Sequence, residues 1–154
     1  MIVSRKEVKE ISKKLKEEGK KIVFTNGCFD LIHKGHIYLL QEAKKLGDVL
    51  IVGINSDKSV KRIKGEKRPI LKEEERTFII DNIKGVDYVV LFDEETPYEL
   101  IKEICPDFIV KGGDYKEEEV VGGEFVKKSG GKVVIIPYLE NFSTTKLIER
   151  IKNE

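Results

Sequence analysis

The fold is decided by one stretch of sequence, which begins with Lys21-Ile-Val-Phe-Thr-Asn26, continues through Gly35 to Leu46, and ends with Asp48-Val-Leu-Ile-Val-Gly-Ile54. The two outer segments are short apolar runs rich in β-branched residues, as in strands buried on both faces. Between them, Ile37 and Leu40 recur at helical spacing. A buried strand, a helix and a second buried strand predict a parallel βαβ unit.

The same alternation continues along the chain. Further buried strands are expected at 88–92, 107–110 and 132–136, and further helices at 4–18, 72–83, 97–105, 118–128 and 143–151. Five apolar strands alternating with helices predict an α/β fold with a Rossmann-like, doubly wound, five-stranded parallel sheet. With no linker or repeat visible, residues 1–154 are expected to form a single domain.

Two helices carry more detailed expectations. Ser4 and Glu7 have the spacing of a capping box at the start of the first helix, and Gly19 suits a left-handed stop at its end. In the helix at 72–83, Phe78 and Ile79 are expected to face inward, together with Ile83.

Composition narrows the class of ligand. The 29 basic and 28 acidic residues leave a net charge of +1, so no basic excess favours nucleic acid or a membrane surface, and a small-molecule partner is expected.

Cys28 and Cys105 lie far apart and form neither a disulfide framework nor a metal-ligand pair. Without a signal-peptide pattern, or the apolar run of ~20 residues that a membrane span needs, a cytoplasmic location is expected. The Lys- and Glu-rich composition, 37% charged, resembles that of thermophile proteins.

Candidate chemistry lies in three loops that follow predicted strands, at 26–36, 111–115 and 141–145. In open parallel sheets ligands bind at the carboxyl ends of the strands, so these loops are expected to converge. The first loop contains the only histidines, His33 and His36, at the start of a helix, where free backbone N–H groups attract anions. Two imidazoles there would add hydrogen-bond donors for phosphate. Helix capping and packing, or a metal site with further ligands, are the alternatives.

Several motifs in the chain resemble those of a known enzyme superfamily. Gly27-Cys-Phe-Asp-Leu-Ile-His-Lys-Gly-His36 and Ser143-Thr-Thr-Lys-Leu-Ile148 resemble the two signatures of the cytidylyltransferase-like nucleotidyltransferase superfamily (HxGH). Lys111-Gly-Gly-Asp-Tyr115 and Arg68-Pro-Ile-Leu71 are most similar to the bacterial D-glycero-β-D-manno-heptose 1-phosphate adenylyltransferases. Tyr138-Leu-Glu-Asn-Phe142 departs from the Arg-Thr-Glu-Gly-Ile of glycerol-phosphate cytidylyltransferases, which argues against cytidylyl transfer.

The resemblance implies an enzyme that transfers AMP from ATP to D-glycero-D-manno-heptose 1-phosphate, giving ADP-heptose and pyrophosphate for the lipopolysaccharide core. It also implies Mg²⁺ carried by ATP, no metal site built by the protein, and a homodimer. A cytidylyltransferase acting on glycerol 3-phosphate is the alternative within enzymes. A non-catalytic module that senses nucleotides is the alternative from another class, because fold alone permits it.

Residue roles follow from the same resemblance. His33 and His36 would stabilise the phosphates in the transition state. The expected nucleotide-binding residues are Cys28, Phe29, Gly35, Gly113, Asp114, Ser143, Thr144 and Thr145. The expected phosphate- or substrate-binding residues are Asp30, Lys64, Arg68, Arg76 and Lys111.

Several of these residues have plainer interpretations. Asp30 could only order its loop through hydrogen bonds, and Ser143 to Thr145 could only cap the last helix. The basic segment 61–68 could be a solvated loop or a flap that closes over the pyrophosphate.

Overall fold

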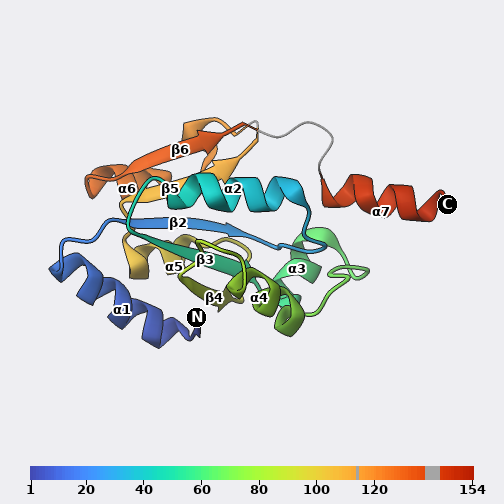
Figure 1. The fold of residues 1–154 in the computed structure, drawn as a ribbon, viewed down its shortest axis with the longest axis horizontal. Helices are drawn as coiled ribbons and strands as arrows, with labels where there is room; N and C mark the ends of the chain where they lie inside the picture. The colour runs from blue at the N-terminus through green and yellow to red at the C-terminus, as the bar shows by residue number, and fades with distance from the viewer. Residues whose placement is uncertain (114, 138–142) are drawn as a thin grey trace.

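The computed structural model describes residues 1–113, 115–137 and 143–154. Six parallel strands form one sheet in the order β1-β4-β3-β2-β5-β6 (Figure 1). The strands are β1 (Ile2–Val3), β2 (Ile22–Gly27), β3 (Val49–Asn55), β4 (Tyr88–Phe92), β5 (Phe108–Gly112) and β6 (Lys132–Ile136). The helices are α1 (Arg5–Glu17), α2 (Lys34–Lys44), α3 (Asp57–Lys64), α4 (Glu73–Asp81), α5 (Tyr98–Ile104), the 3₁₀ helix η1 (Glu117–Glu119), α6 (Gly123–Lys128) and α7 (Thr144–Lys152).

Helices cover both faces of the sheet, as the sequence predicts. On one face, α1, α5 and α6 contribute Val8, Ile101 and Val126 to a core with Phe24 and Ile51 of the sheet. The second core is on the opposite face, where α2 and α4 pack Leu40, Ala43 and Ile80 against Val52 and Val89. Alternate side chains of each strand point to opposite faces, so strands buried on both sides must be apolar throughout.

The first helix confirms its predicted ends. Ser4 accepts a hydrogen bond from the backbone N–H of Glu7, and the Glu7 carboxylate accepts one from the N–H of Ser4. Gly19 has a φ of 76°, which is a left-handed conformation that side chains disfavour. Local sequence therefore sets both limits of α1.

Three expectations are wrong in detail. The sheet has six strands, because Ile2–Val3 pairs with β4 as an edge strand too short to show a periodicity. The helix expected at 118–128 is divided into η1 and α6, since Gly122, with a φ of 79°, turns the chain between them. Phe78 is 65% exposed, because α4 turns Arg76 and Ile80 toward the interior instead.

The strand order also fixes where a ligand can enter. From β2 the chain moves outward through β3 to β4, then crosses back to place β5 on the other side of β2. The connections therefore reverse direction between β2 and β5, which creates a crevice at the carboxyl ends of these two strands. Figure 1 shows α7 beyond the same end of the sheet.

Candidate active site

The predicted convergence of loops is confirmed for the described residues. Thr144, in the first turn of α7, donates a hydrogen bond from Oγ1 to the carbonyl oxygen of Asp30 at 2.7 Å. The ammonium of Lys111, near the end of β5, lies 3.1 Å from Oδ1 of Asn26, near the end of β2. Segments more than 80 residues apart in sequence thus meet around the loop that follows β2.

The rings of His33 and His36 lie against each other at a tilt of 42° at the start of α2. His33 is the N-cap, and its Nδ1 accepts a hydrogen bond from the backbone N–H of Gly35 at 3.1 Å. The Nδ1 of His36 accepts one from the backbone N–H of His33, also at 3.1 Å. The two ring centroids are 3.9 Å apart. The capping interpretation is therefore confirmed.

Capping also sets the chemistry of the rings. An Nδ1 that accepts a hydrogen bond has no proton, so each neutral ring carries its proton on Nε2. Burial lowers the pKa of His33, and burial together with the adjacent His33 lowers the pKa of His36 to about 4. Both rings are then neutral Nε2–H donors at neutral pH, at a helix N-terminus that favours anions.

The loop before the two histidines has an energetically unfavourable backbone conformation. Phe29 and Leu31 both have left-handed φ values, 51° and 54°, which non-glycine residues rarely adopt. The Phe29 ring is buried, 5.7 Å from the ring of His36 between centroids. A Cβ atom at Gly27 would lie 3.1 Å from the same ring. Packing around Phe29 therefore holds the loop in a conformation that its sequence does not favour by itself.

Asp30 has the structural role that the sequence left as one of two interpretations. Its carboxylate is 2% exposed and accepts hydrogen bonds from the backbone N–H groups of Ile70 and Leu71, at 2.7 and 2.9 Å. It also forms an ion pair with Arg68, whose Nε lies 3.1 Å away. Asp30 therefore ties the histidine loop to the segment that precedes α4.

Arg76 is buried against the histidine loop. Its side chain is fully buried, and Nη1 donates to the carbonyl oxygens of Cys28 and Asn55, both at 2.7 Å. Nε donates to Leu71, and Nη2 pairs with the Asp57 carboxylate at 2.8 Å. All of these acceptors belong to the protein, so Arg76 supports the loop from below. Its expected contact with phosphate remains a prediction.

Asp57 is a residue that sequence reasoning missed. Its carboxylate pairs with Arg76 and also accepts a hydrogen bond from the backbone N–H of Glu73, which fixes the start of α4. Asp57 lies two residues after Asn55, the last residue of β3, so the rule that ligand-binding polar groups gather at the carboxyl ends of strands could have identified it.

Cys28 directly follows β2, and Lys111 lies near the carboxyl end of the neighbouring strand β5. Burial raises the pKa of the Cys28 thiol, although the nearby cations Lys64, Arg76 and Arg68 oppose the shift. Burial lowers the pKa of Lys111 to about 8. The ammonium donates to the Oδ1 and carbonyl oxygens of Asn26. A desolvated cation is thus held at the carboxyl edge of the sheet.

The last helix confirms its predicted cap. Ser143 accepts a hydrogen bond from the backbone N–H of Lys146, while Thr144 binds the histidine loop and Thr145 is exposed. Their expected contacts with the triphosphate remain a prediction.

The remaining expected residues differ in exposure. Gly113 is buried, with a φ of 98°, and donates a hydrogen bond to the carbonyl oxygen of Ile136, whereas Lys64 is exposed at the end of α3. Asp114 and the stretch 138–142 lie outside the described residues.

The described residues contain no group of three His, Cys, Asp or Glu side chains that could hold a metal ion. Within that part of the chain, no helix is both long and apolar enough to cross a membrane.

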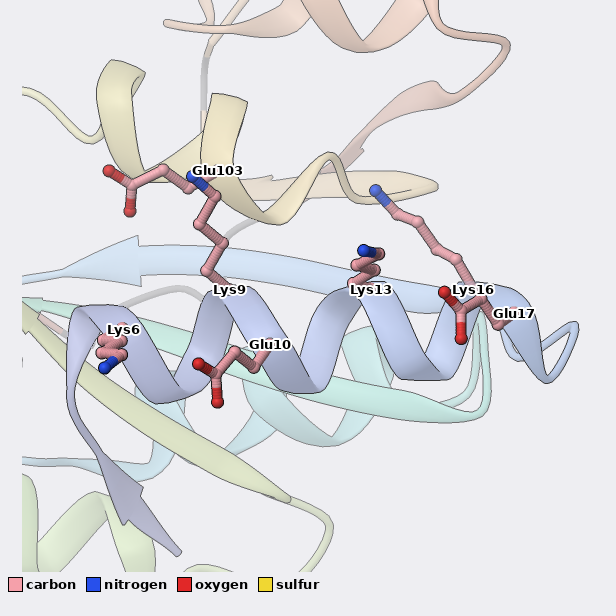
Figure 2. Close-up of a pocket in the computed structure, with 7 residues that line it drawn as sticks. All are labelled: Lys6, Lys9, Glu10, Lys13, Lys16, Glu17 and Glu103. Atoms are coloured by element: carbon pink, nitrogen blue, oxygen red, sulfur yellow. The ribbon is translucent and has the colours of Figure 1, made fainter.

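A cavity of about 580 Å³ lies elsewhere, on the outer surface of α1 (Figure 2). Figure 2 shows that charged side chains of α1 border it, together with Glu103 from α5. None of the residues expected at the active site lines this cavity. The charged hollow is therefore separate from the crevice between β2 and β5.

Comparison with known families matches residues 24–150 to the Cytidylyltransferase-like family model, which covers most of the chain. Among curated relatives, the "Bifunctional protein HldE" of Nitratiruptor sp. is 54% identical over 147 residues, or 96% of this chain and 31% of the relative. The protein of the same name from Wolinella succinogenes is 53% identical over 151 residues, with 98% and 31% covered. The chain therefore spans about a third of the length of these relatives.

Solved structures agree on the fold. The lipopolysaccharide core biosynthesis protein from Thermoplasma volcanium is 35% identical with a TM-score of 0.65, covering 80% of this chain and 100% of its own. Pantoate-beta-alanine ligase from Francisella tularensis has a TM-score of 0.63 and covers 100% of this chain and 79% of its own. At 18% identity, the second likeness shows the fold alone.

Proposed function

Because the chain belongs to the cytidylyltransferase-like family of nucleotidyltransferases, we propose that it transfers AMP from ATP to D-glycero-D-manno-heptose 1-phosphate. The products are ADP-heptose and pyrophosphate. The main structural support for this chemistry is the pair His33 and His36. Their Nδ1 atoms accept hydrogen bonds from backbone N–H groups at the start of α2. The similarity to HldE proteins over 96% of the chain supports the choice of acceptor.

The proposed reaction is a direct in-line displacement. A phosphate oxygen of the sugar 1-phosphate forms a bond to the α-phosphorus of ATP, and the bond from that phosphorus to the bridging oxygen of pyrophosphate breaks. The attacking phosphate is ionised near neutral pH, so no general base is needed. Catalysis then rests on positioning and on donors directed at the charge that develops.

His33 and His36 would supply such donors through Nε2–H. Their low pKa in the free protein keeps both rings neutral, and the negative charge of a bound triphosphate would shift both pKa values upward. Proton uptake on binding would convert neutral donors into charged ones at the moment they face phosphate. Losing one preorganised donor typically costs on the order of 10²–10³ in rate.

We expect Mg²⁺ to bind together with ATP, as the metal–nucleotide complex. The carboxylate of Asp30, which lies in the histidine loop, is occupied by two backbone N–H groups and by Arg68. Mg²⁺ bound to a nucleotide takes most of its ligands from phosphates and water, so it needs no protein cage. The described residues offer none.

Pyrophosphate release tests the reaction. ATP and CTP are each combined with heptose 1-phosphate and with glycerol 3-phosphate in the presence of Mg²⁺. Release with ATP and the heptose phosphate is the expected result. Pyrophosphate release only with CTP and glycerol 3-phosphate would instead support the alternative cytidylyltransferase function.

His33→Ala separates an enzyme from a nucleotide sensor. We expect turnover to fall by roughly 10²–10³ while ATP binding, measured by calorimetry, is retained. Lys34→Ala changes an exposed neighbour in the same turn and is the matched control. Near-normal turnover in His33→Ala would overturn the role assigned to the pair. The expected homodimer is checked on the same samples by sedimentation.

A further inference from the structure

The first residues of α3 and α4 bind each other's backbone. The N–H of Asp57 donates a hydrogen bond to Oε1 of Glu73, and the N–H of Glu73 donates one to Oδ1 of Asp57, both at 2.9 Å. In a capping box the two partners belong to one helix, whereas these two lie 16 positions apart and join two helices. Each carboxylate lies at a helix N-terminus, where the partial positive charge favours it. The two helix starts are therefore held together as one unit.

The carboxylate of Asp57 also orients Arg76. Its Oδ1 atom accepts a hydrogen bond from Nη2 of Arg76 at 2.8 Å and forms an ion pair with it. The Arg76 side chain is fully buried, and burying a guanidinium is costly unless it is paired and hydrogen-bonded. The guanidinium is planar and rigid, so holding Nη2 also directs Nη1 to the carbonyl oxygen of Cys28, 2.7 Å away. Asp57 therefore fixes the orientation of the group that contacts the histidine loop.

The same guanidinium also holds the histidine loop through Leu71. Nε of Arg76 donates to the carbonyl oxygen of Leu71 at 2.9 Å, and the N–H of Leu71 donates to the carboxylate of Asp30, also at 2.9 Å. The loop is thus attached to Arg76 directly at Cys28 and through Leu71 at Asp30. Between these two points lies Phe29, whose left-handed φ of 51° persists only where the surrounding contacts maintain it. A shift of Arg76 would therefore move the loop and the two histidines to which it leads.

We propose that Asp57 and Glu73 are positioning residues for nucleotidyl transfer, which hold the histidine loop through Arg76 in the geometry that the transition state requires. This inference rests on the proposed function and adds two residues that act without touching the substrates. In the proposed reaction, hydrogen-bond donors must face the charge that develops on phosphate, and a displacement of about 1 Å can lower the rate by roughly 100-fold. Loss of either residue should therefore affect kcat more than nucleotide binding.

A matched pair of substitutions in the first turn of α4 tests the proposal. Glu73→Ala removes the carboxylate that binds Asp57, whereas Glu75→Ala removes a carboxylate that caps the same helix by accepting a hydrogen bond from the N–H of Lys72. In the pyrophosphate assay we expect Glu73→Ala to lower kcat by about 5- to 20-fold, with KM for ATP within about threefold of the wild type. Glu75→Ala should leave kcat unchanged. Equal values of kcat in the two variants would show that Glu73 is only a helix cap.

Asp57→Ala is the stronger variant, because it removes the ion pair with Arg76 together with the bond to Glu73. We expect kcat to fall by roughly 10- to 100-fold. Asp57→Asn keeps an oxygen acceptor in the same position and should recover most of the lost kcat. All rates are measured well below the unfolding temperature of each variant, so a loss of stability alone leaves kcat unchanged. Glu73→Ala keeps the ion pair of Arg76 and maintains the test if Asp57→Ala does not fold.

The histidines provide a measurement that needs no substrate. Burial and the adjacent His33 lower the pKa of His36 to about 4 in the wild type. If Asp57 and Glu73 hold the loop, their removal exposes the His36 ring to water, and its pKa, followed by NMR titration, should rise towards 6.5. A wild-type pKa or a wild-type kcat in both Asp57→Ala and Glu73→Ala would overturn the proposal. If the wild type releases no pyrophosphate from ATP and heptose 1-phosphate, the proposed function fails, whereas the titration still decides whether Asp57 and Glu73 position the loop.

Discussion

The Arg76→Lys substitution would show whether a buried guanidinium holds the histidine loop in place. Arg76 donates to the carbonyl oxygens of Cys28, Asn55 and Leu71 and pairs with the carboxylate of Asp57, all within 2.9 Å. These acceptors come from three separate segments around α4. Lysine keeps the positive charge but has its donors on a single atom, so it can reach at most about two of the four acceptors.

The magnitude follows from the bonds that lysine cannot make. Each hydrogen bond to a charged group contributes about 1.5–3 kcal/mol, so two lost bonds lower the unfolding free energy by about 3–6 kcal/mol. A domain of this size has roughly 5–15 kcal/mol in total. With a urea slope of about 2 kcal/mol/M, the unfolding midpoint should fall by about 1.5 M or more.

Urea titration followed by circular dichroism measures this shift. Arg62→Lys is the matched control, because Arg62 is exposed and donates a hydrogen bond to the carbonyl oxygen of Asp93. A midpoint for Arg76→Lys within about 0.3 M of the wild type would refute the supporting role. Unchanged stability combined with weaker ATP binding would instead favour direct contact between Arg76 and the phosphates.

Two further predictions concern the same loop. Asp30→Asn replaces one carboxylate oxygen by an amide nitrogen, which cannot accept a hydrogen bond, and it removes the ion pair with Arg68. The melting temperature should therefore fall by about 5–10 °C, as measured by calorimetry. Because burial lowers the pKa of His36 to about 4 from 6.5, the fold disfavours its protonated form, and stability should decrease as pH falls from 6.5 towards 4, by up to about 3 kcal/mol. In His36→Gln this part of the pH dependence should disappear from urea titrations at pH 7 and pH 4.5; an unchanged dependence would contradict the assignment.

The sequence by itself determined the elements whose signals are local. Ser4 and Glu7 set the start of α1, and the apolar runs identified five of the six strands. His33 and His36 could be placed at a helix start, because a cap and its partner lie within one turn of each other. The doubly wound class followed from the alternation of strands and helices, which needs no knowledge of which strand pairs with which.

Only the tertiary structure decided which distant groups meet. Nothing local indicates that β5 returns to the side of β2, and that choice places Lys111 beside Asn26, 85 positions earlier in the chain. The inward face of α4 is another such case. Its apolar pattern favoured Phe78, yet Arg76 occupies the interior because four acceptors from other segments compensate its burial. Periodicity records the local preference of a helix or strand, whereas a buried charge depends on partners that only the folded chain brings together.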